Sequence, residues 1–204
     1  MTELFNNGFE SGDFSAWTGT IGTPTIVETP VHHGSYAVQI NANEYPIKTL
    51  PSTYTTVFTR IYVRVTNTGD SHFIEILSVS GAADQDATLT AVMIPQWAMW
   101  YRNNGSRTRI STATSPAINT WYCVESEVII GAGNGEARMY VDGVKILEAT
   151  GLTNNDYGNI DRVLVGGYGT NERFIDCVVV ADAYIGQEAA GGQQLFTLIN
   201  MEDY

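Results

Sequence analysis

Apolar and polar residues alternate along much of this chain, and this period of two limits what it can fold into. In the segment 59–65 the branched apolar residues Ile61, Val63 and Val65 alternate with Arg60, Tyr62 and Arg64. Successive side chains of a strand point to opposite faces, so this pattern predicts a half-buried strand. The same alternation occurs at 35–40, 73–79, 121–130, 136–141, 162–165 and 174–185. Many short segments of this kind predict packed antiparallel sheets.

Turn-forming residues separate the predicted strands. The pair Asp142-Gly143 lies between two alternating segments and tolerates the positive φ angles of a two-residue hairpin turn. The segment 103–105 predicts a second tight turn, and a helix is expected only as a short candidate at 193–201. With 204 residues, the chain fits an all-β, two-sheet antiparallel jelly-roll sandwich over residues 1–187, followed by a short C-terminal tail over 188–204.

The charge balance argues against several classes of partner. Acidic residues outnumber basic ones by 22 to 10, giving a formal net charge of −12. No basic face is available to neutralise phosphates, so we expect no nucleic acid partner. No run of about 18 apolar residues occurs, so no membrane insertion is expected. The first five residues lack the basic and apolar regions of a signal peptide, and the expected location is an extracellular surface or a virion.

Two cysteines, Cys123 and Cys177, each fall within a predicted strand. They form a disulfide if those strands are neighbours with suitable geometry, and are otherwise two small buried side chains. The sequence does not decide between these alternatives.

The tail carries more apolar residues than a completed sandwich needs. The segment 188–192 predicts a flexible hinge. It is followed by Leu195, Phe196, Leu198, Ile199 and Met201. These side chains need burial on the sandwich or on a neighbouring subunit. We therefore expect other protein subunits as partners through the tail, including a second copy in a homo-oligomer.

Five motifs carry a family resemblance over roughly residues 5–187. They are an Asn-Gly-Phe-Glu opening with a Gly-Asp turn and a Trp at 7–18, the strand 32–38, the Thr-Trp-Tyr strand 120–122, the Tyr-Val-Asp-Gly hairpin within 137–143 and the Ile-Asp-x-Val strand within 174–178. In order and spacing the chain resembles the concanavalin A-like lectin and glucanase superfamily, which includes laminin-G-like and jelly-roll carbohydrate-binding domains.

The resemblance implies a structural Ca²⁺ where the first and last strands meet. Carried over to this chain, its ligands are Glu10 and Asp176, with Asp13 and Asp182 as lesser candidates. Ca²⁺ takes six to eight oxygen ligands, and an acidic turn supplies several of them at once. The alternative is that Glu10 and Asp13 make local turn hydrogen bonds and that Asp176 is solvated. Cys177 stands where many relatives have a further acidic residue or Asn, so one ligand is missing.

The chain has only part of the catalytic motifs of the enzymes that it resembles. Glu125 and Glu127 share a face as paired glycosidase carboxylates would, but no third acidic residue follows, so we predict a solvated polar face. The Gln-x-His motif of lyases on similar sandwiches is absent. The three histidines, His32, His33 and His72, are too few for a zinc site unless carboxylates assist. We therefore expect no enzyme activity.

Sugar binding needs exposed aromatic rings beside directional polar groups. The segment 96–104 places Trp97 and Tyr101 on one face and Trp100 and Arg102 on the other. These large aromatic residues could instead fill the core.

A second candidate binding face is the polar side of the segment 59–65, with Arg60, Tyr62 and Arg64, which could share one concave sheet with the segment 96–104. Trp17 and Trp121 are assigned to the core.

Three functional hypotheses follow. The first is a non-catalytic glycan-binding or adhesive module with a structural calcium. The second is a structural subunit of a larger particle, such as a virion decoration or fibre-associated protein. The third is a polysaccharide-degrading enzyme.

Overall fold

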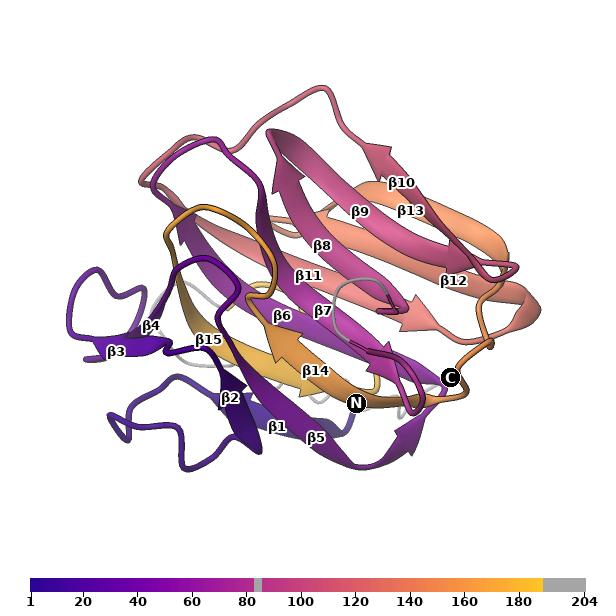
Figure 1. Ribbon diagram of the computed structural model, residues 1–204, viewed down its shortest axis with the longest axis horizontal. Helices are drawn as coiled ribbons and strands as arrows, with labels where there is room; N and C mark the ends of the chain where they lie inside the picture. Colours follow the sequence, from indigo (N-terminus) through magenta and orange to yellow (C-terminus); the bar gives the residue numbers. More distant parts are fainter. Residues whose placement is uncertain (83–85, 189–204) are drawn as a thin grey trace, which may run out of the picture.

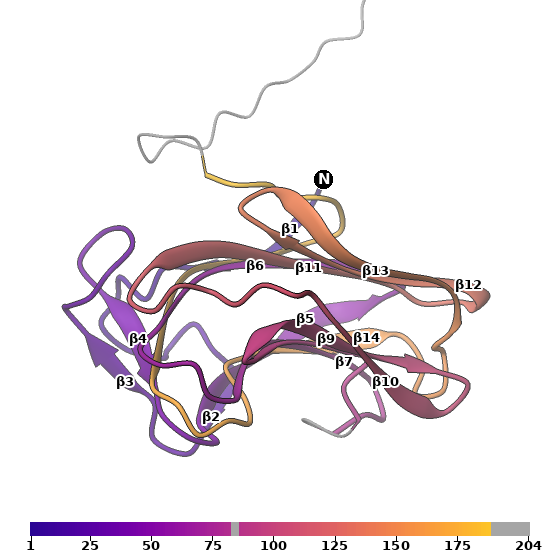
Figure 2. The ribbon, with the colours of Figure 1, turned by 90° about the horizontal axis from the view of Figure 1, so that it is seen from above.

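Two antiparallel β-sheets pack face to face in the computed structural model, which describes residues 1–82 and 86–188 (Figures 1 and 2). This part of the chain contains no α-helix, and the all-β prediction is confirmed. The eight-stranded sheet has the order β13-β12-β11-β6-β15-β4-β3, with β1 paired to β15. The seven-stranded sheet has the order β10-β9-β8-β7-β14-β5-β2.

The strands of the eight-stranded sheet are β1 (Glu3–Asn7), β3 (Thr25–Val27), β4 (Ala37–Ile40), β6 (Thr56–Val65), β11 (Trp121–Ile129), β12 (Ala132–Val141), β13 (Val144–Thr153) and β15 (Arg173–Ala181). Those of the seven-stranded sheet are β2 (Gly19–Ile21), β5 (Tyr45–Tyr54), β7 (Ser71–Ser78), β8 (Leu89–Ile94), β9 (Gln96–Asn103), β10 (Ser106–Ser111) and β14 (Ile160–Val165).

The alternation predicted for β6 is the one observed. Ile61, Val63 and Val65 are buried in the core between the two sheets, whereas Arg60 and Tyr62 lie on the opposite, outer face. β6 is hydrogen-bonded on both sides, to β11 and β15, so it is a central strand. It therefore fixes which residues of its two neighbours face outward.

Both predicted hairpin turns are confirmed. Asp142 and Gly143 have φ angles of 49° and 76° between β12 and β13, and Asn104 and Gly105 have φ angles of 50° and 72° between β9 and β10. Two consecutive residues with positive φ form the type I′ turn, whose twist matches that of the flanking strands. The second hairpin brings the polar residues of β10 beside those of β9.

The opening motif forms one end of the core. The rings of Phe9 and Trp17 stack with centroids 5.6 Å apart, and Phe5 meets Trp17 edge-on at 4.9 Å. The indole N–H of Trp17 donates to Asn7 Oδ1 at 3.0 Å, so its polar atom is satisfied inside the sandwich. The assignment of Trp17 to the core is confirmed.

Beyond β15 the chain turns back over the outer face of the eight-stranded sheet. The strand predicted to run to Ile185 ends at Ala181, and in Figure 2 the segment that follows lies outside the sheet. The carboxylate of Glu125 accepts the backbone N–H groups of Ile185 and Gly186 at 2.8 and 2.9 Å. We call residues 182–188 the return segment; the helix candidate at 193–201 lies outside the described residues.

No helix long and apolar enough to cross a membrane occurs in residues 1–82 and 86–188. Cys123 and Cys177 are both buried and both free, so the disulfide alternative is not realised. They lie on the outer face of the eight-stranded sheet, in one cluster with Tyr62.

Candidate functional site

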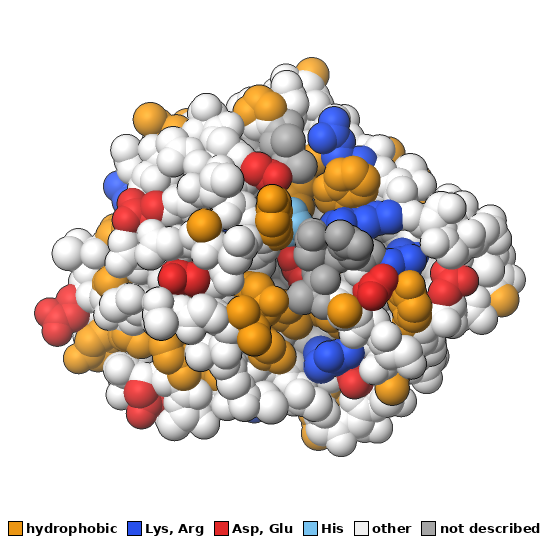
Figure 3. All heavy atoms as spheres, viewed as in Figure 1, with side chains coloured by type: hydrophobic (Ala, Val, Ile, Leu, Met, Phe, Trp, Pro, Cys, Tyr) orange, Lys and Arg blue, Asp and Glu red, His pale blue; other side chains and the backbone are white. Residues whose placement is uncertain are grey.

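Cationic and aromatic side chains gather on the outer face of the seven-stranded sheet. Trp100 on β9 pairs with Arg109 on β10, and Arg102 pairs with Arg107, so all four side chains point outward from adjacent strands. Figure 3 views the molecule from this side and shows Lys and Arg side chains gathered beside hydrophobic ones. We call Trp100, Arg102, Arg107 and Arg109 the arginine-tryptophan patch.

Trp100 is the centre of this patch. The guanidinium carbon of Arg107 lies 4.7 Å from the centroid of its ring and that of Arg109 lies 5.8 Å away. Trp100 is half-buried and Arg109 is exposed. Cation–π contacts hold both guanidinium groups beside the ring.

Arg102 anchors the patch to the structure. Its guanidinium donates to Asp86 Oδ1 at 2.8 Å and lies 4.4 Å from the centroid of the Tyr157 ring. Tyr157 in turn donates its hydroxyl to the same Asp86 oxygen at 3.0 Å. These contacts bury Arg102. Its main role is therefore to hold the end of β9 in place, and little of its side chain is available to contact a ligand.

A buried histidine–glutamate pair lies on the same outer face, on β7. Nδ1 of His72 is 2.8 Å from Glu75 Oε1, and both side chains are buried. Because Glu75 pairs with Thr90 of β8, and Thr90 pairs with Trp100, the acid lies two strands from the patch. A carboxylate bound to one ring nitrogen fixes the tautomer of a histidine and makes the other nitrogen the proton acceptor.

The loop after β14 closes over this pair. The ring of Tyr168, which is 49% exposed, has its centroid 5.7 Å from that of His72. Gly167, with φ of 112°, permits this approach, because a Cβ there would lie 2.3 Å from Glu75 Oε1. Arg173 donates to the carbonyl of Gly167 at 2.7 Å, and burial lowers its pKa to about 10, so it remains charged at neutral pH.

The structure places the two candidate binding faces, on the segments 96–104 and 59–65, in different sheets. β9 belongs to the seven-stranded sheet and β6 to the eight-stranded sheet, so Arg60, Tyr62 and Arg64 do not share a concave face with Trp100. Arg60 and Tyr62 are also buried beneath neighbouring segments. Only Arg64 is partly exposed; it donates to the carbonyl of Asn119 at 3.2 Å.

Trp97 and Tyr101 share a face, as the alternation predicts, but that face points inward, so the candidate role of these two residues in binding a ligand is not supported. Trp97 is 5% exposed and meets Phe73 and Tyr122 edge-on, so it is a core residue. Tyr101 also packs against the core. The assignment of Trp121 to this core is wrong, because it pairs with Arg64 and packs in the outer cluster of Tyr62 and the cysteines.

Glu125 and Glu127 are buried, so the prediction that they form a solvated polar face is wrong. Glu125 holds the return segment through its two N–H contacts. Glu127 accepts from Arg138 at 2.7 Å and from the hydroxyl of Tyr140 at 3.0 Å. Burial raises the pKa of Glu125 above its ordinary value.

The four predicted calcium ligands are not brought together as one set. Asp13 accepts hydrogen bonds from Ser11 and Ser15 in its own turn, and Asp182 accepts the N–H of Thr2 at 2.5 Å. Glu10 and Asp176 both lie near Gly8, where an added Cβ would be within 4 Å of both side chains.

Glu10 and Asp176 bind the loop that precedes β4. Ser35 N–H donates to both Glu10 oxygens, at 3.1 and 2.9 Å, and Tyr36 N–H donates at 3.1 Å. The N–H groups of His32 and His33 donate to Asp176 Oδ2 at 2.9 and 3.0 Å. Because these carboxylates accept hydrogen bonds from backbone N–H groups, they are better suited to holding the loop in place than to coordinating Ca²⁺, which takes six to eight oxygen ligands. The calcium site stays a prediction.

Replacing Glu10 with Gln should lower the free energy of unfolding by about 1 kcal/mol, because an exposed carboxylate loses part of its charge-assisted bonding to the loop. We expect added Ca²⁺ to leave the melting temperature of the EDTA-treated wild type unchanged. Thermal melting of both proteins tests this, with Glu3→Gln, which alters an exposed carboxylate bonded to Asn6, as the control. A melting temperature that falls with EDTA and recovers with Ca²⁺ would instead establish the calcium site.

Comparisons with known proteins support the fold. No family model matches the sequence, and no curated protein matches it. An endo-β-1,4-glucuronan lyase from the fungus Trichoderma reesei superimposes with a TM-score of 0.67 at 13% identity, covering 89% of this chain and 96% of the lyase. The T. cruzi calreticulin globular domain gives 0.58 at 12% identity, covering 90% and 89%. The receptor-binding domain of a botulinum neurotoxin C/D mosaic serotype gives 0.61 at 9% identity, covering 90% of this chain and 48% of that domain.

The fold is a jelly-roll β-sandwich. At these identities the likeness shows the fold alone, and it is consistent with the concanavalin A-like superfamily that the sequence motifs resemble. The arginine-tryptophan patch and the His72–Glu75 pair are features of this chain's own side chains. Sequence alternation found Trp100 and Arg102 but missed the pair, whose residues are three apart in a strand and share a face only because the ladder shifts register between His72 and Ile74.

Proposed function

We propose that this protein binds an acidic polysaccharide on the outer face of the seven-stranded sheet. The observation that carries the proposal is the position of the cations. The chain has ten Lys and Arg residues and a net charge of −12, yet two of its arginines, Arg107 and Arg109, lie against the ring of a single tryptophan on β9. A local positive field on an acidic protein favours an anionic ligand.

The side chains of the patch match the chemistry of a uronic acid. An indole ring packs against the C–H face of a sugar, and a guanidinium binds a carboxylate through paired N–H groups. Arg107 and Arg109 both lie against the Trp100 ring, so a sugar stacked at this ring would have its carboxylate within reach of a cation. A neutral glucan could use the ring but would gain no charge-assisted contact with a guanidinium.

The proteins that share this fold are in line with a sugar ligand. One acts on glucuronan, according to its description as an endo-β-1,4-glucuronan lyase. Another, botulinum neurotoxin type C, is described as depending on interaction with two ganglioside molecules for cell entry. This agreement supports the class of ligand and leaves its identity to experiment.

Binding should be measured by calorimetry with β-1,4-glucuronan oligosaccharides and with neutral β-1,4-glucan oligosaccharides of the same length. We expect only the glucuronan oligosaccharides to bind, with an affinity that falls as the salt concentration increases. Arg109→Gln and Trp100→Ala should each weaken binding by about tenfold, as the loss of one charge-assisted bond or one ring contact predicts. Lys145→Gln on β13 changes the net charge equally and should bind as the wild type does. Equal binding of both glycans, or of neither, would contradict the proposal.

The His72–Glu75 pair favours a second candidate function, cleavage of the same polysaccharide by β-elimination. In such a reaction a base takes the C5 proton of the uronate, the electron pair forms a C4=C5 double bond, and the C4–O4 bond breaks. The leaving O4 oxygen then takes a proton. With Glu75 bound to Nδ1, the ring of His72 is the candidate base, and the phenol of Tyr168 is the candidate acid.

The binding experiment separates the two candidates. Cleavage would produce the ultraviolet absorbance of the unsaturated uronate, and His72→Ala would abolish it while leaving the arginine-tryptophan patch intact. Binding without this absorbance would identify a non-catalytic module. The assembly hypothesis depends on the apolar tail residues Leu195, Phe196, Leu198, Ile199 and Met201, which lie outside the described residues, and it stays a prediction.

A further inference from the structure

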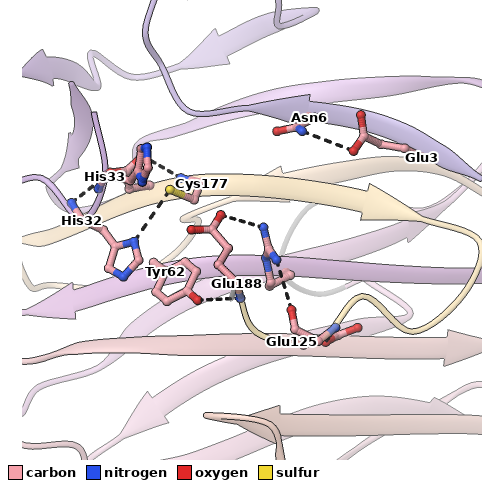
Figure 4. A network of polar contacts seen from close by, with 11 residues as sticks. Glu3, Asn6, His32, His33, Tyr62, Glu125, Cys177 and Glu188 are labelled. Carbon is pink, nitrogen blue, oxygen red and sulfur yellow. Dashed lines mark hydrogen bonds and ion pairs between the residues drawn. The ribbon is translucent and has the colours of Figure 1, made fainter. Parts of the chain in front are cut away.

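Three possible metal ligands meet on the outer face of the eight-stranded sheet, on the opposite side of the sandwich from the arginine-tryptophan patch. His32 precedes β4, Cys177 lies on β15, and Glu188 ends the return segment (Figure 4). One ligand atom from each lies within 4.8 Å of the other two, and no other group of three His, Cys, Asp or Glu residues in 1–82 and 86–188 meets this criterion. The fold therefore joins segments that are far apart in sequence.

His32 is held in place by its backbone and by its ring. Its N–H donates to Asp176 Oδ2 at 2.9 Å, and its imidazole stacks on Tyr62 with centroids 3.6 Å apart and planes 15° apart. Trp121 meets the ring edge-on at 5.7 Å. Burial lowers the pKa of His32, so the ring is neutral at neutral pH and has a lone pair to donate. A fixed, neutral imidazole is the form that binds metals.

Cys177 is turned outward by an irregularity in β15. The pairing of β15 with β6 shifts register between Asp176 and Val179, and Cys177 has φ of 51°, which is unusual for a residue other than glycine. Its N–H donates to Asp176 Oδ1 at 2.7 Å. Backbone strain of this kind persists where the surroundings impose it, and such positions cluster at binding sites.

Glu188 reaches the cluster along the return segment. Its N–H donates to the hydroxyl of Tyr62 at 3.1 Å, and Arg60 donates to its Oε1 at 3.0 Å. A carboxylate has a second oxygen, so the contact with Arg60 leaves Glu188 able to bind a cation as well. Burial and the nearby carboxylates of Asp176 and Glu188 raise the pKa of the Cys177 thiol above its ordinary value, and Arg60 opposes them.

We propose that His32 Nδ1, Cys177 Sγ and the Glu188 carboxylate bind one Zn²⁺ ion. Zinc takes a thiolate sulfur at about 2.3 Å and an imidazole nitrogen at about 2.0 Å, which places these atoms about 3.6 Å apart in a tetrahedral site. The observed distance from Sγ to Nδ1 is 3.8 Å. Sulfur and nitrogen ligands select zinc over Ca²⁺ or Mg²⁺, which prefer oxygen.

The site would leave the fourth position of the ion to water. Binding releases one proton, because the Cys177 thiol must become a thiolate, and the thiolate and carboxylate together balance the two charges of Zn²⁺. The bound ion would tie the return segment to β15 and to the loop before β4. Without a metal, the same 3.8 Å separation fits an S–H group of Cys177 donating to the imidazole of His32.

Co²⁺ spectroscopy on the full, untagged chain distinguishes the two arrangements. We expect one equivalent of Co²⁺ to produce a near-ultraviolet thiolate-to-metal band, which one equivalent of Zn²⁺ abolishes. Zinc should also protect one thiol from alkylation. A hydrogen-bonded thiol would give no charge-transfer band, and that result in the wild type would overturn the proposal without any variant being made.

Variants then assign the ligands. Cys177→Ser and His32→Phe, the second of which keeps a ring to stack on Tyr62, should each weaken zinc binding by about a hundredfold, and Glu188→Gln by about tenfold. Cys123→Ser is the matched control, because it removes the other buried thiol of the same face and should leave the cobalt band and the zinc affinity unchanged. A band that survives in Cys177→Ser, or that disappears in Cys123→Ser, would refute this set of ligands.

Discussion

An Arg60→Met variant should unfold with a free energy about 3 kcal/mol below that of the wild type. Arg60 is 1% exposed, and its guanidinium donates to the carbonyl of Gly186 at 3.1 Å and to Glu188 at 3.0 Å. Its charge also acts on the buried carboxylate of Glu125, its partner across the strand pair. Methionine fills a similar volume but leaves Glu125 buried without this cation. Urea unfolding at neutral pH measures the difference.

Arg64→Met is the matched control for this prediction. Arg64 lies four residues along the same strand on the same face, but it is more exposed and donates only to the carbonyl of Asn119 among the described hydrogen bonds. Its loss should cost less than about 1 kcal/mol, as for other surface charges. Equal losses in the two variants would mean that the buried contacts of Arg60 with the return segment contribute nothing specific.

The burial of Arg60 shows where sequence reasoning stopped. Alternation correctly put Arg60, Tyr62 and Arg64 on the outer face of a strand. It could not show that the return segment crosses that face, because the contacts join residues about 126 positions apart. A side chain that points away from the core of the sandwich is therefore not always exposed to solvent. The same limit explains why Glu125 was assigned to solvent.

The strands that the sequence missed have physical reasons in common. β5 contains Pro46 and Pro51, which interrupt a strand pattern, and β10 is largely polar and exposed at the edge of its sheet. β1 is short and has a single paired neighbour, β15. Strong alternation identifies central strands such as β6 and β11, whereas edge strands are determined by the partner they find.

The candidate site was predictable only in part for a similar reason. Period two assigned Trp100 and Arg102 to a common face, but no local pattern tells which of two sheets a strand joins. The patch becomes a site because β10 adds Arg107 and Arg109 through a hairpin. The proposed zinc ligands, His32, Cys177 and Glu188, could not be predicted from the sequence, because they lie far apart in it and form no common motif.

Alkaline pH should destabilise the protein through Cys123, which is 2% exposed. Burial raises the pKa of its thiol from an ordinary value of 9.0 to about 12. Below pH 9 the thiol is protonated in both folded and unfolded chains and does not change stability with pH. Between pH 9 and about 12 the unfolded chain loses this proton while the folded chain keeps it, so the unfolded state is favoured increasingly as pH rises. One group contributes about 1.4 kcal/mol per pH unit in this window, or about 4 kcal/mol across it.

Urea unfolding of wild type and Cys123→Ala from pH 8 to 11, with reductant and EDTA present, isolates this contribution. Alanine removes the ionisable thiol, so the variant should lose stability less steeply above pH 9, although it starts lower by about 1 kcal/mol because it also loses buried volume. The comparison uses slopes, so this offset cancels. Tyr62, whose pKa burial raises to about 12, adds an alkaline loss of its own in both proteins and cancels as well. Parallel curves for the two proteins would mean that the folded structure does not hold this thiol neutral, and that the outer cluster of the eight-stranded sheet is open to water.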